Sequence, residues 1–274
     1  MTSHKLALIT GGSSGIGFAL AKLLVADGSD VCLLARNYGK LQASQQTLSQ
    51  QSVRKDQKIE VISADVTNYE TLAHVLDEWT ADFDVPDLVI NSAGVTYPGY
   101  FQDLDVETFH WLMDVNYFGT LHVLKCLIPK MIARGSGTIV NISSQAGLIG
   151  IFGYSGYGAS KYAIQGLSDV LRAEMKPLGI KVSVVYPPDT QTPQLEFEKD
   201  LKPPETKALS ANSSVLSADH VARTILKGVK KGKYLIIPGF EGKLLFRLTQ
   251  LLGSLTYPVM DLLIRQAQKS KKSN

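Results

Sequence analysis

The chain has 274 residues, of which 45% are hydrophobic and 19% charged, and it contains two cysteines, Cys32 and Cys126. This length fits one large domain or two small ones and suffices for a core that needs no disulfide. The composition excludes collagen-like, disordered and disulfide-scaffold proteins, and two cysteines without ligand spacing predict no metal site. There are 28 basic and 25 acidic residues, and four of the basic ones lie in the last ten positions. The body is therefore nearly neutral, and we expect no nucleic-acid partner.

Short apolar segments alternate with helix-sized segments along the chain. Strands are predicted at Leu6–Thr10, Val31–Ala35, Ile59–Ser63, Leu88–Asn91, Thr138–Ser143, Val182–Tyr186 and Tyr234–Ile237. Helices are predicted at Ile16–Ala26, Leu41–Gln51, Tyr69–Ala81, Val115–Ala133, Ser160–Lys176 and Ala218–Lys230. Strands that are apolar throughout are typical of sheets covered on both faces. The pattern predicts the α/β class, with a single doubly wound Rossmann domain and a parallel seven-stranded sheet.

One region in the second half of the chain does not follow this alternation. Residues 188–217 contain Pro193, Pro203 and Pro204 and show no clear strand. A segment of that length without elements of its own is usually a lid or a binding loop. We therefore expect a lid over residues 188–217.

A Leu-rich segment follows, and the predicted sheet does not require it. If Lys243–Arg265 is one helix, its polar residues form a narrow stripe, and Pro258 should kink or split it. The wide apolar remainder must be covered. It could pack on the domain's own core or on a partner subunit. Alternatively, it could lie in a membrane interface, with Arg265 and the basic residues of 269–272 on anionic headgroups.

The first predicted strand leads into a glycine-rich turn. Its residues are Thr10, Gly11, Gly12, Ser13, Ser14, Gly15, Ile16 and Gly17. Glycines allow the backbone to approach a pyrophosphate closely, and the following helix start offers free N–H groups to phosphates. A glycine-rich turn without a ligand is the alternative. The preceding strand, the following helix and the position near the chain start favour dinucleotide binding.

The end of the second predicted strand bears on the choice of dinucleotide. Rossmann sites for NAD usually place an acidic residue here, to bind the 2′-hydroxyl of the ribose. This chain has Ala35 in that position, followed by Arg36. An arginine there suits a 2′-phosphate, although a surface arginine is also common at a strand end. We expect NADPH as the cofactor.

Polar residues and glycine also follow the third and fourth predicted strands. These are Asp65 with Val66, and Asn91 with Ser92, Ala93 and Gly94. The carboxyl ends of the strands form the edge at which open α/β sheets bind ligands. Each group could also be a simple turn or helix cap, since Asp, Asn and Gly are common in turns.

A serine, a tyrosine and a lysine form the candidate catalytic set. Ser144 follows the fifth predicted strand, and Tyr157 and Lys161 stand four positions apart in a helical stretch, so they share a helix face. An ammonium near a phenol favours the phenolate and should lower the pKa of Tyr157. Such a tyrosine can exchange a proton with an alcohol or ketone oxygen, which Ser144 could also bind.

Together these motifs resemble the short-chain dehydrogenase/reductase family over about residues 5–230. The resemblance implies that Asn116 holds a water of the proton relay, that Lys161 binds the nicotinamide ribose and that Thr192 contacts the carboxamide. The full cofactor-binding set that it implies is Thr10, Gly11, Ser13, Ser14, Gly15, Ile16, Gly17, Arg36, Asp65, Val66, Asn91, Ala93, Gly94, Tyr157, Lys161, Pro187, Thr190 and Thr192. We expect two parts of the chain: a dinucleotide-binding reductase domain, 1–241, which includes the lid 188–217, and an amphipathic C-terminal extension with a basic tail, 242–274.

A narrower resemblance is to the 3-ketodihydrosphingosine reductase group. It rests on three segments, 143–147, 157–164 and 186–193, and in the last of these Pro187-Pro188 replaces the more usual Pro-Gly. The chain departs from the group at Gln194, where glycine is usual. It also lacks the N-terminal membrane segment of eukaryotic members. The resemblance implies NADPH-dependent reduction of a ketone on a long-chain lipid, 3-ketosphinganine to sphinganine.

Other functions remain open at this point. One alternative is another NADPH ketoreductase, acting on steroids, retinoids or acyl chains. Another is a non-catalytic dinucleotide-binding regulator, which would not need Ser144, Tyr157 and Lys161. By resemblance we expect a homo-oligomer, a dimer or tetramer. With no visible signal peptide and no apolar run of ~18 residues, we expect a cytoplasmic protein without a transmembrane helix.

Overall fold

The sheet is built from short runs of buried aliphatic residues. The computed structural model describes residues 6–210 and 214–272, with side chains up to residue 268. The seven parallel strands run in the order β3-β2-β1-β4-β5-β6-β9. They are β1 Leu6–Thr10, β2 Asp30–Ala35, β3 Ile59–Ser63, β4 Leu88–Asn91, β5 Gly137–Ile142, β6 Ile180–Val185 and β9 Leu235–Ile236. All seven predicted strands are confirmed, three of them with the predicted ends and four with ends shifted by one or two residues.

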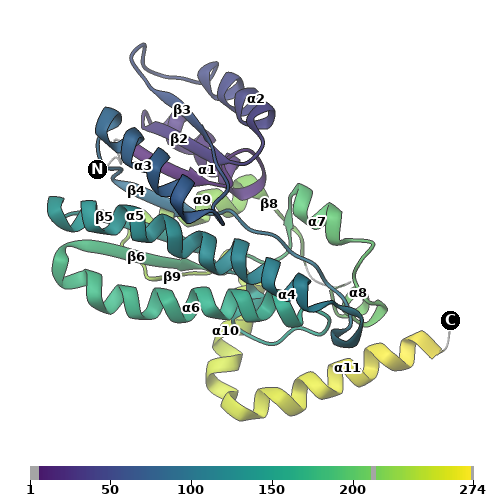
Figure 1. Ribbon diagram of the computed structural model, residues 1–274. Coiled ribbons are helices and arrows are strands. Elements are labelled where there is room, and N and C mark those ends of the chain that lie inside the picture. Colours follow the sequence, from purple (N-terminus) through teal and green to yellow (C-terminus); the bar gives the residue numbers. More distant parts are fainter. Residues whose placement is uncertain (1–5, 211–213, 273–274) are drawn as a thin grey trace.

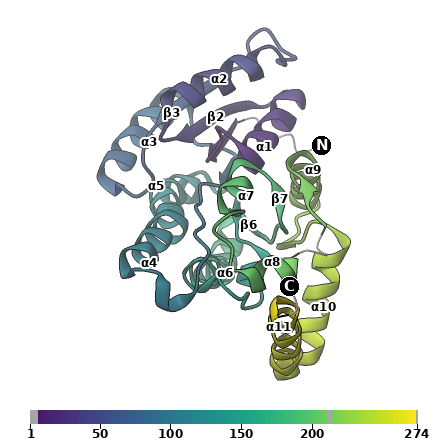
Figure 2. The ribbon, with the colours of Figure 1, turned by 90° about the vertical axis from the view of Figure 1, so that its right-hand side faces the viewer.

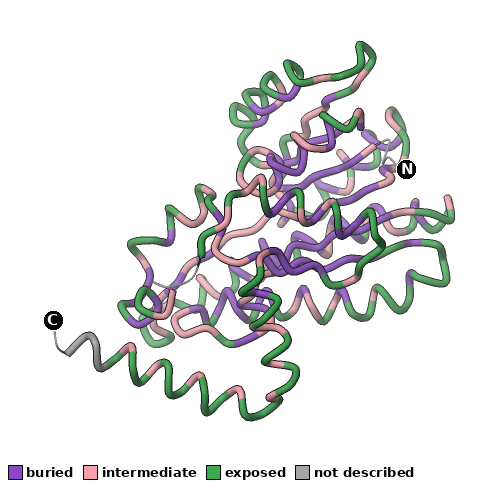
Figure 3. The backbone as a smooth tube through the Cα atoms, turned by 180° about the vertical axis from the view of Figure 1, so that it is seen from behind, coloured by how far each residue is buried: buried purple, intermediate pink, exposed green. Residues whose placement is uncertain are grey.

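Helices cover both faces of this sheet (Figure 1). One face packs against α1 Gly15–Ala26, α2 Tyr38–Ser49 and α9 Ala218–Lys230. The other packs against α3 Tyr69–Phe83, α5 Gly119–Arg134 and α6 Ser155–Met175. Figure 3 shows the strands as the buried centre between these layers. The predicted doubly wound α/β fold is confirmed.

The strand order reverses between β1 and β4, which are adjacent in the sheet although β2 and β3 separate them in sequence. Ile9 of β1 is paired with Leu33 of β2 on one side and with Ile90 of β4 on the other. Crossovers leave in opposite directions at such a point, so a crevice opens beyond the carboxyl ends of the strands. Thr10 and Asn91 end their strands there side by side.

The helix predicted at Val115–Ala133 is more complex than expected. Residues Asp114–Phe118 form a π-helical turn that joins α4, Val106–Met113, to α5. The sequence pattern predicts neither the turn nor α4. A π-turn inserts one residue into the helical repeat and is frequent at functional sites. Here it carries Asn116.

The lid region is not a structureless loop, which corrects the prediction for residues 188–217. It contains β7 Thr190–Gln191, α7 Pro193–Glu198, α8 Pro204–Ser210 and β8 Leu216–Ser217. Strands β7 and β8 pair in parallel as a small second sheet. The Thr192 hydroxyl caps α7 by accepting from the Leu195 N–H at 3.3 Å. Pro193 and Pro204 each begin a helix, a position that needs no N–H, so they start helices here instead of interrupting them.

The C-terminal segment is two helices, not one. Helix α10 covers Phe240–Leu252 and α11 covers Thr256–Lys272. The break lies at Gly253, which has a φ of 53°, and not at Pro258, which stands in the first turn of α11, where proline is tolerated. The two helices meet at an angle (Figure 1) and project from the molecule below α9 and α8 (Figure 2), and α11 packs against α8. Across the described part of the chain, no helix is long and apolar enough to cross a membrane.

Candidate active site

The glycine-rich turn after β1 faces the crevice, and because its glycines have no side chains, a ligand can approach the backbone closely. Gly11 and Gly15 have φ of 64° and 54°, a region that favours glycine. A Cβ on Gly17 would lie 2.5 Å from the Gly11 carbonyl oxygen, so a side chain there would displace the turn. The Thr10 hydroxyl accepts from the N–H groups of Ser92 and Ala93 at 3.1 and 3.0 Å, which fixes the turn to the end of β4.

The start of α1 fits a phosphate. Its N-cap, Ser14, makes no side-chain cap, and the first turn contains no acidic residue. The first N–H groups of a helix lack partners within the helix, and the helix dipole favours an anion there. A buried acceptor, the side-chain oxygen of Asn91, also has no hydrogen-bond partner among the described residues. These features fit the pyrophosphate and nucleoside of a dinucleotide.

Arg36 and Asp65 lie beside each other at the ends of β2 and β3. Their Nη1 and Oδ2 atoms are 3.8 Å apart, and the Arg36 side chain is 60% exposed. This loose pair leaves the guanidinium accessible to another anion. Val66 turns inward, where its side chain packs against Gly119 and its carbonyl contacts His122 Nδ1 at 2.8 Å.

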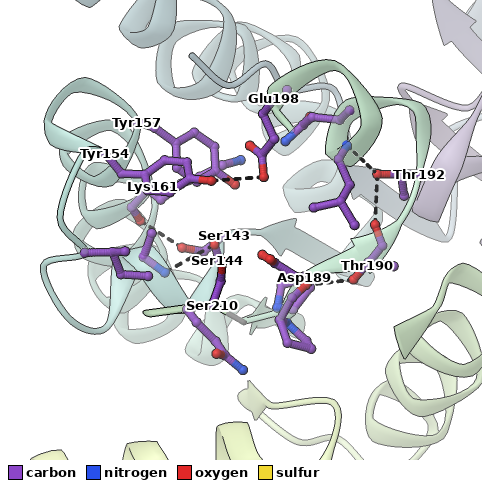
Figure 4. A pocket seen from close by; sticks show the side chains of 18 of the residues that line it. Ser143, Ser144, Tyr154, Tyr157, Lys161, Asp189, Thr190, Thr192, Glu198 and Ser210 are labelled. Carbon is purple, nitrogen blue, oxygen red and sulfur yellow. Dashed lines mark hydrogen bonds between the residues drawn. The ribbon is translucent and has the colours of Figure 1, made fainter. Parts of the chain in front are cut away.

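Ser144, Tyr157 and Lys161 come together at the start of α6 (Figure 4). Ser144 follows β5, lines the same cavity as Tyr157 and acts on it so as to lower its pKa. The Lys161 ammonium donates to the Ile142 carbonyl at 3.1 Å and lies 5.6 Å from the centre of the Tyr157 ring. The Ser143 hydroxyl donates to the Lys161 carbonyl at 2.9 Å, which links the strand to the helix. The predicted set therefore shares one site.

The pKa of Tyr157 differs from the one expected from the sequence. Burial raises the pKa of Tyr157 above its ordinary value, and hydrogen bonds from Ser144 and Gln194 only partly oppose it. Burial lowers the pKa of Lys161 to about 8. The predicted lowering of the tyrosine pKa by the ammonium is therefore wrong for this state of the site, because desolvation outweighs the other effects. A tyrosine that keeps its proton is suited to donate it.

Asn116 has its side chain fully engaged. Its amide donates to the Val95 carbonyl at 3.0 Å and to the Ser160 hydroxyl at 2.9 Å, and its oxygen accepts from the Val95 N–H at 2.8 Å. The buried amide thus joins the π-turn to the segment after β4 and to α6. The role expected for it in holding a water stays a prediction.

A single cavity of about 440 Å³ connects the glycine-rich turn with the catalytic set and the C-terminal helices. Of the predicted site residues, those that line it are Gly11, Ser14, Gly15, Ile16, Gly94, Ser144, Tyr157, Lys161, Pro187, Thr190 and Thr192. Those that do not line it are Thr10, Ser13, Gly17, Arg36, Asp65, Val66, Asn91, Ala93 and Asn116. Several of the second group support the first, as Thr10 and Asn116 do through their hydrogen bonds.

The cavity also has polar lining residues to which the sequence analysis gives no role. They are Gln145, Tyr154, Asp189, Gln194, Glu198, Lys202, Thr206, Ser210 and Glu241. Gln194, noted above only as a departure, acts on Tyr157 so as to lower its pKa. Glu198 and Lys202 stand four positions apart across the end of α7 and form an ion pair at 2.9 Å. In the sequence, the only sign of this pair is the spacing of four positions. Exposed ion pairs on helices have the same spacing, so it does not indicate a buried pair.

Comparisons with known proteins agree with this geometry. The short chain dehydrogenase family profile matches residues 5–201. The chain is 37% identical to a 3-ketodihydrosphingosine reductase of Bos taurus, over 88% of this chain and 73% of that protein. It is also 37% identical to one of Dictyostelium discoideum, over 95% and 82%. Among solved structures, a short-chain dehydrogenase from Sphingobium yanoikuyae in complex with NADPH has a TM-score of 0.77 at 29% identity, covering 93% and 95% of the two chains.

These similarities cover most of the chain and include the glycine-rich turn and the serine, tyrosine and lysine. The narrower resemblance to the 3-ketodihydrosphingosine reductase group is confirmed at the level of sequence identity. The chain belongs to the short-chain dehydrogenase/reductase family and is an oxidoreductase that uses a nicotinamide dinucleotide and acts on a CH–OH group.

Proposed function

We propose that the protein reduces the ketone of 3-ketosphinganine, or a close long-chain amino ketone, with NADPH. The observation that carries this proposal is the lining of the cavity. One cavity brings Ser144 and Tyr157 together with apolar side chains of the C-terminal helices, Leu245 of α10 and Met260 and Leu263 of α11. A ketone at the tyrosine would therefore direct a hydrocarbon chain toward the C-terminal helices. The names of the similar reductases support the same substrate.

The residues divide the work of such a reduction. When bound, the reduced nicotinamide supplies the hydride for the carbonyl carbon. Tyr157 donates its proton to the carbonyl oxygen, and the Ser144 hydroxyl donates a hydrogen bond to the same oxygen as negative charge develops there. Lys161 binds the ribose and, once charged, favours the phenolate that remains after proton transfer. Asn116 keeps α6 and the segment after β4 in register, and Thr192 contacts the carboxamide.

Turnover by the purified protein tests this function directly. We expect NADPH absorbance to fall on addition of 3-ketosphinganine in detergent micelles, with sphinganine as the product detected by mass spectrometry. A steroid ketone and a retinal serve as comparison substrates. Turnover of these with no turnover of the amino ketone would favour another ketoreductase. NADPH binding without turnover of any ketone would favour a regulator.

The preference for NADPH is tested at Arg36. Its exposed guanidinium stands at the end of β2, where Ala35 offers no carboxylate to a 2′-hydroxyl. A charge-assisted contact to the 2′-phosphate contributes about 1.5–3 kcal/mol, equivalent to tenfold to hundredfold in affinity. We expect Arg36→Ala to raise the KM for NADPH by that factor and to leave the KM for NADH within twofold. Equal use of both dinucleotides by the unmodified protein would contradict the assignment.

We also propose a cytoplasmic enzyme that contacts membranes through its C-terminal extension, residues 243–274. Many apolar side chains of α10 and α11 are exposed, Leu251 at 82% and Tyr257 at 72% among them. Contiguous exposed apolar surface of this kind marks a binding face. The basic side chains at 269–272 expected to contact headgroups lie outside the residues whose side chains are described. A lipid ketone could then reach the cavity without crossing water.

A homo-oligomer is the remaining proposal on partners. Helices α5 and α6 expose Ile132, Tyr162 and Val170, which a second copy could cover. Light scattering of the purified protein in detergent-free buffer tests this. A mass that remains monomeric at micromolar concentration would exclude the dimer and the tetramer.

A further inference from the structure

A buried charged cluster lies in the cavity beside the catalytic tyrosine. Lys202 Nζ is 2.9 Å from Glu198 Oε1 and 3.2 Å from Asp189 Oδ2. The side chains of Lys202 and Glu198 are each only 7% exposed. The Tyr154 hydroxyl donates to Glu198 Oε1 at 3.0 Å. All four residues line the cavity.

This cluster adjoins the reacting groups. The rings of Tyr154 and Tyr157 lie 5.6 Å apart, so Glu198 reaches the catalytic tyrosine through its neighbour. Figure 4 shows the Glu198 carboxylate pointing toward the two tyrosines, with Asp189 extending into the same space from the segment after β6. Both carboxylates act on Tyr157 electrostatically, raising its pKa. Both carboxylates line the same cavity as Tyr157, so they share the space that a substrate held by Tyr157 would occupy.

The charges of the cluster do not cancel. Two carboxylates face one ammonium, which leaves one formal negative charge in a largely buried place. Burying charges is costly unless each is paired and hydrogen-bonded. Proton donation by Tyr157 is not helped by nearby carboxylates, because they oppose the phenolate formed when the proton leaves. Reduction of a neutral ketone therefore gives no reason for the cluster, whereas a cationic group on the substrate would balance it.

We propose that Glu198 and Asp189 bind the protonated amino group of an amino-ketone substrate, with Lys202 holding the two carboxylates in place. The inference rests on the proposed function and deepens it. In 3-ketosphinganine the amino group is on the carbon next to the ketone, so a carbonyl at Ser144 and Tyr157 brings it to the edge of the cluster. Carboxylates recognise an ammonium through charge-assisted hydrogen bonds. The hydrocarbon chain would contact apolar lining residues such as Leu245 and Leu263.

The test compares two ketones that differ only in this amino group, 3-ketosphinganine and 1-hydroxyoctadecan-3-one. We expect unmodified protein to prefer the amino ketone in kcat/KM by tenfold to hundredfold, the range for a charge-assisted contact. Asp189→Asn and Glu198→Gln should each lower that ratio by about tenfold, mainly through KM. The control is Glu196→Gln, which makes the same charge change on the exposed side of α7 and should keep the ratio. Thermal unfolding is followed for each variant.

The outcomes separate the subsite from the function. Turnover of both ketones with equal kcat/KM by the unmodified protein and the variants would overturn the subsite and leave the reductase function standing. If the variants melt at a lower temperature but keep the ratio of kcat/KM for the two ketones, the cluster stabilises the fold around Tyr154 and does not bind the amino group. If Glu198→Gln does not fold, Asp189→Asn serves as the test of the subsite. The Asp189 side chain is 35% exposed, so this substitution should leave the fold intact. No turnover of either ketone would refute both proposals.

Discussion

Replacing Tyr157 by phenylalanine is expected to lower kcat for a long-chain ketone at least a hundredfold while NADPH affinity changes less than threefold. The hydroxyl is the proton donor to the carbonyl oxygen, and positioned general acids contribute about 10²–10⁴ in rate. Phenylalanine keeps the buried ring and its packing against Tyr154, so the fold should be retained. Stopped-flow absorbance at saturating NADPH measures the first quantity, and fluorescence titration of the nucleotide measures the second.

Two further variants show whether the loss belongs to the hydroxyl. Lys161→Ala should weaken both nucleotide binding and turnover, because its ammonium serves the ribose and the tyrosine. Tyr154→Phe removes the neighbouring hydroxyl, which donates to Glu198 and not to the reacting oxygen, so it should retain far more turnover than Tyr157→Phe. Turnover by Tyr157→Phe within tenfold of the unmodified protein would rule out the assigned proton donor.

Most of the fold can be predicted from local sequence pattern. Each strand is a short apolar run that must be buried on both faces. The helix-sized segments between strands can serve as crossovers that cover both faces, which predicts a parallel sheet. The elements that the pattern misses have causes of another kind. The π-turn at Asp114–Phe118 differs from an α-helix by a single residue per turn. The sequence offers both Gly253 and Pro258 as sites for the break, and the backbone breaks at Gly253, whose φ is 53°, while Pro258 is accommodated in the first turn of α11.

The site divides in the same way. The glycine-rich turn and the tyrosine–lysine pair are each contained in a few consecutive residues, so their spacing is readable. Ser144 reaches Tyr157 because β5 and α6 are neighbours, which the topology also supplies. The cluster of Asp189, Glu198 and Lys202 depends on how residues 188–210 pack against Tyr154. No periodicity encodes that contact. The lid is also where substrate selection is expected, so the residues least predictable from sequence are those that distinguish one reductase from another.

The exposed apolar side chains where α10 meets α11 should determine binding to membranes. We expect a triple variant, Leu251→Ser, Leu255→Ser and Tyr257→Ser, to lose co-sedimentation with anionic vesicles by at least a hundredfold in partition coefficient. All three side chains are more than half exposed, so the substitutions remove little packing within the protein. Transferring each from water would contribute about 1.5–3 kcal/mol if it were fully buried, so even partial insertion of three accounts for this factor.

A matched triple variant distinguishes a membrane face from general surface hydrophobicity. Val53→Ser, Val106→Ser and Leu178→Ser also remove exposed apolar side chains, but from parts of the chain away from α10 and α11 and outside α5 and α6. This control should sediment with vesicles as the unmodified protein does. Equal sedimentation of all three proteins would show that the α10–α11 surface does not bind membranes. A change of oligomeric mass in the Leu251, Leu255 and Tyr257 variant, without a change in vesicle binding, would instead assign that surface to a second copy. The detergent-free kcat/KM for 3-ketosphinganine presented in vesicles should fall together with vesicle binding, because residues of the same two helices line the cavity.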